Sequence, residues 1–153
     1  MSAQPQHYQA HLRLVSKARF KHGPSIDEPL QLTSATAHLS YLQDPLGSTT
    51  QLIDANNAQP KARLDYKSYG KLEGNIPNPN PANPLTYTGR EDDGTGLMYY
   101  RSRYYDPELE VFVSADPMGD AQRYVGGNPL RFKDPMGLCV PLPNPVSVGL
   151  CVN

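Results

Sequence analysis

Two aspartates near the C-terminal end of the chain open the same four-residue motif, D-P-M-G. Asp116 begins the first copy and Asp134 begins the second. Two carboxyl groups that share one site can hydrolyse a peptide bond, because one acid donates a proton while the other activates a water molecule. This chemistry requires that the chain bring the two side chains together on rigid supports. The spacing makes such an acid pair a hypothesis that the fold must test.

The same motif also describes a tight turn. Asp at the first position bonds back to the backbone, Pro at the second presets φ, and Gly at the fourth tolerates the conformation that follows. A third copy, D-P-L-G, begins at Asp44. Turn formation alone therefore explains why Asp, Pro and Gly occupy these positions in all three copies. In the region of the two aspartates, we expect turn-forming residues at Pro117, Gly119, Pro129, Pro135 and Gly137.

Other catalytic or metal-binding arrangements have less support in the sequence. His7 and His11 have the i, i+4 spacing of helical zinc ligands, but no acid or cysteine lies near them and the region is not helical in pattern. Cys139 is more than 100 residues from any histidine that could serve as its base. The stretch GREDDGTG lacks the strand and helix that flank a phosphate-binding loop. We expect no cofactor and no metal.

The elements that position the aspartates are predicted to be strands. Only 38% of the residues are apolar, while 16 prolines, 12 glycines and 10 tyrosines indicate a chain rich in turns and pleated sheet. The segments HLRLV, TTQLI and ARLDYKSYG alternate or have strand composition, and the run from Leu97 to Tyr105 predicts one long strand with alternating faces. The fold class is therefore mainly β, a meander of short antiparallel strands with many turns and with irregular N- and C-terminal segments.

The chain divides into three segments by composition. Residues 1–40 are a weakly specified N-terminal segment, and residues 41–138 form the β region. A proline-rich stretch at 75–84 is predicted to be an exposed insertion with polyproline II character. Residues 139–153 are a short, irregular tail that contains both cysteines, Cys139 and Cys151, whose redox state stays open.

Charge and hydropathy limit the partners and the location. The net charge is −1, so the chain has no overall attraction for nucleic acid. Its basic first 22 residues leave a nucleic-acid-binding arm as a minor alternative. No apolar run approaches the roughly 18 residues that a membrane-spanning helix requires, and no signal-peptide core follows Met1. We expect no membrane span and either a cytoplasmic location or export without a classical signal peptide.

Three longer stretches carry a resemblance to a known family. They are YLQDPLGSTTQLIDANNAQPKARLDYKSYGKL, TYTGREDDGTGLMYYRSRYYDPELEVFVSADPMG and YVGGNPLRFKDPMGL, within residues 41–138. Their most specific parts are the patterns G-L-x-Y-Y-x-x-R-Y-Y-D-P and N-P-x-x-x-x-D-P-x-G-L. The region resembles the C-terminal part of the RHS repeat-associated core domain of Rhs and YD-repeat proteins.

The resemblance implies a fold and a reaction. In this family, YD repeats wind a β-sheet into a hollow shell that encloses a C-terminal polypeptide, often a bacterial polymorphic toxin delivered by a secretion system. An aspartyl autoprotease formed from two D-P-x-G motifs cuts after the Leu that follows the second motif. Carried over to this sequence, the resemblance implies Asp116 and Asp134 as the catalytic pair and Leu138–Cys139 as the scissile bond.

Two departures from the family pattern lead to a different functional expectation. Val111 stands where the family has an Arg that is expected to support the acid pair with its charge. Only 14 residues lie between Gly119 and Asp134, fewer than is typical, and this interval is expected to hinder both carboxyl groups from reaching one bond. We therefore expect a structural or interaction module of a polymorphic-toxin type system that cuts itself poorly or not at all. Its open strand edges would bind another Rhs or YD-repeat protein, or a second copy of the chain. The alternative is an aspartyl autoprotease that cuts once after Leu138 and releases the tail.

Overall fold

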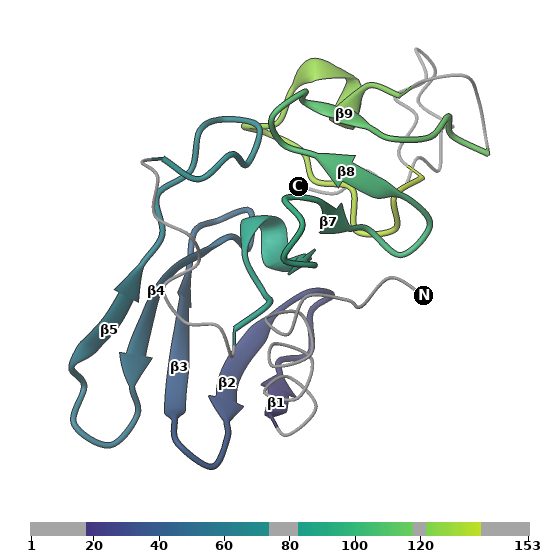
Figure 1. Cartoon of the computed structure of the whole chain (residues 1–153). Helices are drawn as coiled ribbons and strands as arrows, with labels where there is room; N and C mark the ends of the chain where they lie inside the picture. The colour runs from purple at the N-terminus through teal and green to yellow at the C-terminus, as the bar shows by residue number, and fades with distance from the viewer. Residues whose placement is uncertain (1–17, 74–82, 118–121, 139–153) are drawn as a thin grey trace, which may run out of the picture.

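A computed structural model describes residues 18–73, 83–117 and 122–138. Within these residues the chain forms two antiparallel sheets, in which each strand pairs with the next one along the chain (Figure 1). The first sheet contains β1 (Arg19–His22), β2 (Pro29–Thr33), β3 (His38–Gln43), β4 (Thr49–Asp54) and β5 (Pro60–Arg63). The second contains β6 (Glu91–Asp92), β7 (Met98–Tyr99), β8 (Tyr104–Asp106) and β9 (Val111–Phe112). Two 3-10 turns complete the described elements, η1 (Tyr87–Gly89) and η2 (Tyr124–Gly127). The predicted fold class is confirmed.

The first sheet buries one face through the period-two alternation of its strands. In β3, Leu39 and Tyr41 point inward and are buried, whereas Leu42 is exposed. The buried residues of this face, together with Leu64 and Leu85 from outside its strands, form one apolar cluster, made of Leu32, Leu39, Tyr41, Leu52, Ala62, Leu64 and Leu85. The Tyr41 hydroxyl donates to Asn83 Oδ1 at 2.6 Å, so the polar tip of this buried ring has a partner. This cluster holds the large sheet together.

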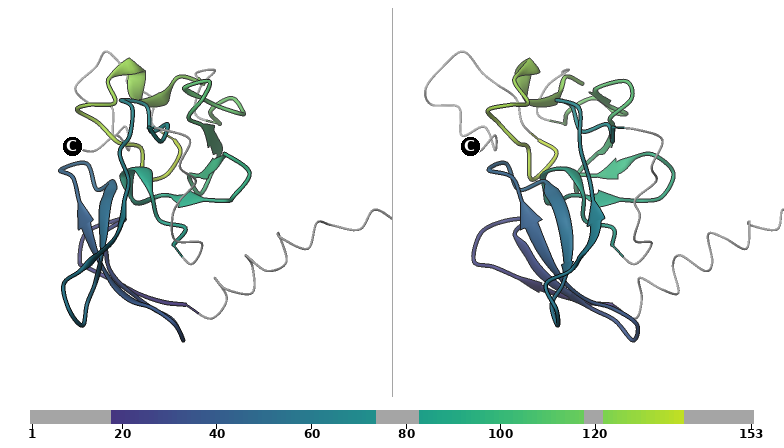
Figure 2. Two further views of the ribbon diagram at one scale, coloured as in Figure 1. Left: turned by 60° about the vertical axis from the view of Figure 1, so that its left-hand side comes forward. Right: turned by 90° about the vertical axis from the view of Figure 1, so that its left-hand side faces the viewer.

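An aromatic cluster forms the core of the second sheet. Its buried members are Tyr87, Met98, Tyr100, Tyr105, Phe112, Tyr124 and Val125. The Tyr105 and Tyr124 rings are the nearest ring pair, with centroids 4.6 Å apart. Tyr66 packs against both this cluster and the core of the first sheet. The two sheets therefore share a continuous apolar contact, and Figure 2 shows the smaller sheet and its loops lying at one end of the larger sheet.

The N-terminal part of the chain contributes more to the fold than its weak pattern predicts. β1, β2 and the start of β3 lie within residues 1–40, and they belong to the same sheet as β4 and β5. The strand predicted for TTQLI is confirmed as part of β4. The HLRLV segment, most of the proline-rich insertion and the tail from Cys139 onward lie outside the described residues. β2 pairs with β3, which begins at His38 and continues into the predicted β region.

The single strand predicted from Leu97 to Tyr105 is wrong. β7 ends at Tyr99 and β8 begins at Tyr104, and the two pair as a hairpin with Tyr99 opposite Tyr104. Between them Arg101 has a φ of +61°, which breaks the alternation. Tyr100 and Tyr105, predicted on opposite faces, are therefore both buried in the aromatic cluster.

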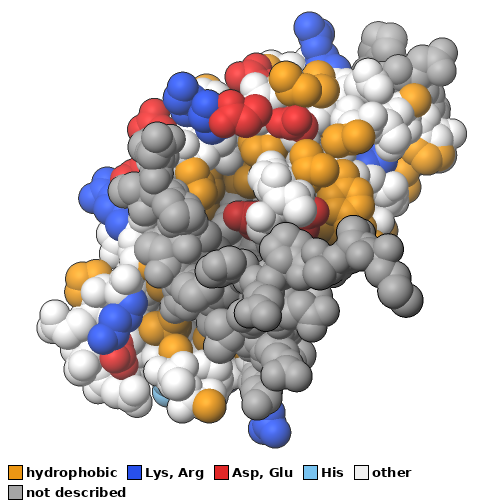
Figure 3. All heavy atoms as spheres, viewed as in Figure 1, with side chains coloured by type: hydrophobic (Ala, Val, Ile, Leu, Met, Phe, Trp, Pro, Cys, Tyr) orange, Lys and Arg blue, Asp and Glu red, His pale blue; other side chains and the backbone are white. Residues whose placement is uncertain are grey.

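The surface of the described residues carries charges of both signs. In the view of Figure 3, Lys and Arg side chains lie beside Asp and Glu side chains along the upper left, and hydrophobic side chains gather over the upper lobe, which contains the small sheet. The exposed large apolar residues of that lobe are Tyr99, Tyr104, Leu109, Val113 and Leu130. Among the described residues, no helix has the length and apolar character that crossing a bilayer requires.

Candidate functional site

Asp116 and Asp134 come together in the folded chain. Asp116 follows β9 and Asp134 follows η2, and both side chains are fully buried. Arg103 lies between them, with its Nη2 atom 2.7 Å from Asp116 Oδ2 and 3.5 Å from Asp134 Oδ2. Both carboxyl groups therefore face the same guanidinium nitrogen.

Arg103 is buried and packs against the Phe112 ring. It lies in the turn between β7 and β8, only 1% of its side chain is exposed, and its guanidinium carbon is 3.6 Å from the centre of the Phe112 ring. Burial lowers the pKa of the Arg103 guanidinium, and the charges of Asp116 and Asp134 oppose that shift. Removing one member of this buried group would be costly, because the remaining groups would stay buried without their partner.

Two expectations from the sequence are corrected by this geometry. Val111 was expected to leave the acid pair without a cation, but Arg103 supplies one from a different element. The interval of 14 residues was expected to hinder the two carboxyl groups from reaching one bond, but both contact Arg103. Neither departure from the family pattern prevents the pair from assembling.

The second D-P-x-G motif forms the predicted turn. The Gly137 N–H points at the Asp134 carbonyl oxygen at 3.5 Å, and Gly137 has a φ of +67°. Pro135 is buried in this turn. The Leu138 N–H donates to Asp134 Oδ1 at 3.0 Å, and Arg103 Nε donates to the Gly137 carbonyl oxygen at 2.6 Å. The peptide group that joins Gly137 to Leu138 is thus fixed at both its N–H and its C=O.

A short stretch after β7 runs along this turn and binds its backbone. Arg101 Nη1 donates to the Pro135 carbonyl oxygen, and the Ser102 N–H donates to the Met136 carbonyl oxygen at 3.3 Å. Arg103 adds the bond to Gly137 described above. Three consecutive residues therefore hold three consecutive carbonyl groups of the turn.

The other predicted site residues have simpler surroundings. Pro129 is buried in a turn in which the Arg131 and Phe132 N–H groups donate to the Asn128 carbonyl oxygen at 3.2 and 3.1 Å. Pro117 is exposed, whereas Gly119 and Cys139, the residue after the predicted cleavage point, lie outside the described residues. In the part of the chain that the structure describes, no group of three or more His, Cys, Asp or Glu side chains could hold a metal ion.

Comparisons with known proteins support the family resemblance. No protein-family model matches the chain. The toxin subunit YenC2 of Yersinia entomophaga is 47% identical over 59 residues, which are 35% of this chain and 6% of that protein. The double-stranded DNA deaminase toxin A of Burkholderia cenocepacia is 34% identical over 103 residues, which are 62% of this chain and 7% of that protein.

A solved structure supports the same conclusion. In the TcdB2–TccC3 structure without the hypervariable C-terminal region, the similar part covers 79% of this chain and 6% of that one, with 30% identity and a TM-score of 0.60. This chain carries the C-terminal region of an Rhs core. The chain spans less than a tenth of the length of each of these relatives.

Arg103 is a residue of the candidate site that was not predicted from the sequence. It is the fixed Arg in the pattern G-L-x-Y-Y-x-x-R-Y-Y-D-P, so the signal was present in the string that carries the resemblance. The pattern does not say what the Arg contacts, and its position 13 residues before Asp116 gives no indication of proximity. Only the fold shows that this Arg joins the two aspartates.

Proposed function

We propose that this chain is the terminal module of an Rhs-type toxin component and that it cleaves itself once, at the Leu138–Cys139 bond. Asp116 and Asp134 would act as the acid pair. The observation that carries the proposal is the meeting of both carboxyl groups at Arg103, beside a Gly137–Leu138 peptide that is fixed at both ends. This arrangement supports hydrolysis better than the inactive module that the sequence departures suggested.

The reaction would need water and one proton held by the acid pair. The ionised carboxylate takes a proton from water, and the water oxygen forms a bond to the Leu138 carbonyl carbon while the protonated carboxyl group donates to the carbonyl oxygen. The C–N bond to Cys139 then breaks. The departing amine takes the proton that the first carboxylate removed from water, and the former carbonyl oxygen returns a proton to the second carboxylate. The products are a new carboxyl group on Leu138 and a free amino group on Cys139.

Arg103 has two roles in this proposal. Its Nη2 atom holds the two carboxyl groups beside each other, and its Nε atom holds the Gly137 carbonyl group. Aspartyl hydrolysis uses an acid pair that shares one proton, and the proposal requires that state of Asp116 and Asp134. Fixed geometry next to the reacting bond also lowers the entropic cost of reaching the transition state.

The relatives indicate the setting of this reaction. YenC2 is a toxin subunit and the Burkholderia protein is a deaminase toxin, and in both the similar region is a small share of a much longer chain. By this analogy, the cut separates an Rhs core from the polypeptide that follows it. In the present chain, the segment after the cut is CVPLPNPVSVGLCVN.

Intact-mass spectrometry of the purified full chain tests the proposal. We expect the wild-type protein to separate into fragments 1–138 and 139–153, whereas Asp116→Asn and Asp134→Asn stay whole because each removes one acid of the pair. Asp44→Asn is the matched control, since it changes the same position of the third D-P-x-G turn without touching the acid pair. A wild-type chain that stays whole for days between mildly acidic and neutral pH would contradict the proposal.

A second candidate function is docking through strand edges. β1 and β5 are the outer strands of the five-stranded sheet, and in the described residues no strand pairs with their outer sides. Unpaired backbone N–H and C=O groups on an edge strand can accept a further strand, here from an Rhs or YD-repeat shell or from a second copy of this chain. Light scattering of the uncut Asp134→Asn chain tests self-association. A monomer at all concentrations would exclude pairing between copies.

A further inference from the structure

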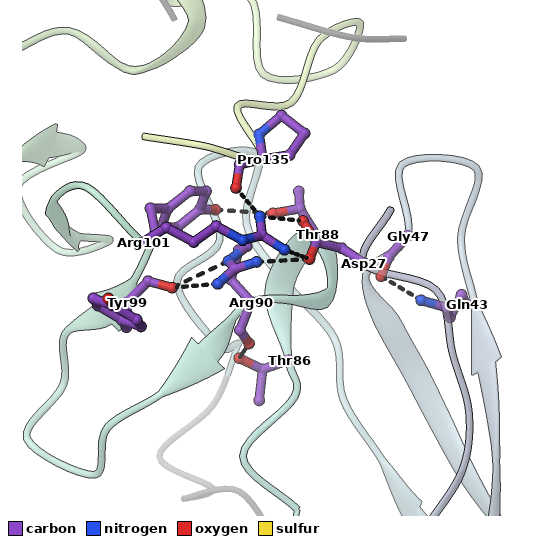
Figure 4. Close-up of polar contacts among 10 residues, drawn as sticks. Asp27, Gln43, Gly47, Thr86, Thr88, Arg90, Tyr99, Arg101 and Pro135 are labelled. Carbon is purple, nitrogen blue, oxygen red and sulfur yellow. Dashed lines mark hydrogen bonds and ion pairs between the residues drawn. The ribbon is translucent and has the colours of Figure 1, made fainter. Parts of the chain in front are cut away.

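The loop between β1 and β2 reaches the acid-pair turn through a buried carboxylate. Asp27 belongs to this loop, and only 6% of its side chain is exposed. Its Oδ1 atom lies 2.6 Å from Arg90 Nη1 and 2.6 Å from Arg101 Nη2, and its Oδ2 atom lies 3.2 Å from Arg101 Nη1. Figure 4 shows the two guanidinium groups side by side against the Asp27 carboxylate.

The backbone around Asp27 is fitted to this position. Asp27 has a φ of +57°, an unfavourable conformation for a residue other than glycine, although Asp tolerates it better than most. The β1–β2 loop can approach η1 this closely only because residue 89 is a glycine. A Cβ atom at Gly89 would lie 2.4 Å from the Asp27 carbonyl oxygen. The cost of the Asp27 conformation indicates that the surrounding contacts hold it there.

Arg90 and Arg101 both bind the Asp27 carboxylate, but each connects it to a different part of the chain. Arg90 Nε and Nη2 donate to the Tyr99 carbonyl oxygen at 3.1 and 2.9 Å, so this Arg joins Asp27 to the end of β7. Arg101 joins Asp27 to the Pro135 carbonyl oxygen in the turn of the second D-P-x-G motif (Figure 4). Arg101 is thus the link between the N-terminal loop and the Asp134 turn.

We propose that Asp27 is a positioning residue for the acid pair and that it acts through Arg101. Arg101 is 36% exposed, so it needs an anchor to keep its guanidinium on Pro135 rather than in solvent. Asp27 supplies that anchor with two contacts to the guanidinium fork. Self-cleavage then depends on docking of the β1–β2 loop, which precedes the three sequence stretches that carry the family resemblance.

The inference rests on the proposed self-cleavage, and cleavage of the full chain provides its first test. Asp27→Asn removes the charge that holds Arg101, and we expect cleavage to slow by about 10- to 100-fold, since small displacements at a reacting centre have effects of this size. Arg101→Gln should slow cleavage to a similar extent, and Arg101→Lys should restore part of the rate by keeping the charge. In the double variant Asp27→Asn/Arg101→Gln, the second change should add little to the first.

Tyr41→Phe is the stability control. It removes a buried hydrogen bond from the core of the first sheet and so lowers the stability of the fold without touching the turn. Its cleavage rate should stay that of the wild type at temperatures well below its unfolding midpoint. A wild-type rate in Asp27→Asn, or two single effects that add in full in the double variant, would overturn the inference while leaving self-cleavage intact. Should Asp27→Asn not fold, a wild-type cleavage rate in Arg101→Gln would by itself overturn the inference.

Hydrogen exchange separates this inference from the proposed function. If the wild-type chain never cleaves, the self-cleavage proposal fails, but the positioning of the turn can still be measured at the Leu138 amide, which donates to Asp134. Asp27→Asn should speed exchange at Leu138 and at Ser102, whose amide donates into the same turn, and should leave exchange at Leu52 in β4 unchanged. Unchanged exchange at Leu138 and Ser102 would overturn the inference.

Discussion

At the scale of single residues, one motif has two different environments. The Asp44 carboxylate caps its turn, accepting from the Leu46 and Ser48 N–H groups at 2.9 and 2.8 Å, and it is partly exposed. The Asp134 carboxylate caps its turn in the same way through the Leu138 N–H, but it is also buried and faces Arg103. The turn chemistry is therefore common to both copies. Burial and the shared guanidinium are what make Asp134 a candidate for catalysis.

Removal of Arg103 is predicted to destabilise the fold strongly. In Arg103→Met, two buried carboxyl groups lose their cation, and we expect the free energy of unfolding to fall by roughly 3 to 5 kcal/mol at neutral pH. Urea denaturation followed by circular dichroism measures this. The triple variant that also carries Asp116→Asn and Asp134→Asn should recover most of the loss, because no charge is then left buried. A loss of less than about 1 kcal/mol in Arg103→Met would contradict the assigned role.

At the scale of elements, the connection between β7 and β8 positions the turn that follows Asp134. β7 and β8 are only two and three residues long, yet their connection places Arg101, Ser102 and Arg103 along the Pro135–Gly137 turn. The turn comes so close to the hairpin that a Cβ atom at Gly137 would lie 2.4 Å from the Tyr100 carbonyl oxygen. Gly137 is therefore required both by its φ of +67° and by this contact.

Gly137→Ala is predicted to disturb both the fold and the site. The added methyl group would overlap a backbone oxygen and the residue would keep a positive φ, so we expect a loss of about 2 to 4 kcal/mol of stability and much slower self-cleavage. Gly96→Ala is the matched control, because Gly96 has a φ of +95° but no atom within 4 Å of the added Cβ. It should lose only about 1 to 2 kcal/mol, from backbone strain, and cleave at the wild-type rate. Equal losses in both variants, measured by urea denaturation, would exclude the steric contribution.

At the scale of the whole molecule, a tyrosine-rich core joins the two sheets to the site. Tyr66 contacts both apolar clusters, and the Tyr124 ring lies within the second one. The Tyr100 hydroxyl lies 2.9 Å from Thr88 Oγ1 and 3.3 Å from the Tyr124 hydroxyl. Burial raises the pKa of Tyr124 to about 12, against opposing hydrogen bonds with Tyr100, Thr88 and the Asp134 backbone. Burial likewise raises the pKa of Tyr100 well above its ordinary value.

These shifts predict a loss of stability in alkali. Tyrosines of the unfolded chain lose their protons from about pH 10, whereas Tyr124 in the folded chain keeps its proton until about pH 12. The stabilisation is thus fully present below pH 10 and declines as the pH rises toward 12, by roughly 3 kcal/mol for Tyr124 alone. Urea denaturation across this range should show a shallower decline in Tyr124→Phe than in the wild type. Tyr104→Phe, which removes an exposed hydroxyl, should decline like the wild type; an unchanged decline in Tyr124→Phe would contradict the prediction.

The sequence by itself determined the features that depend on local chemistry. Proline, glycine and tyrosine content with period-two alternation gave a mainly β meander, and the D-P-x-G motifs gave turns that the structure confirms at Asp44 and Asp134. The family pattern pointed to the two aspartates and contained Arg103 as a fixed letter. The single strand predicted from Leu97 to Tyr105 is wrong, because the tight hairpin connection gives Arg101 a positive φ that no periodic pattern indicates.

Only the tertiary structure decided what surrounds the aspartates. Asp27 and Arg101 are 74 residues apart, and the contacts of Arg103 reach both Asp116 and Asp134. Such pairs form when packing of the two apolar clusters closes long loops, so neither spacing nor residue type reveals them in advance. The supporting cation was expected at position 111 by family pattern, but the fold takes it from Arg103, because a buried carboxylate pair needs a positive charge nearby and not at a particular place in the sequence.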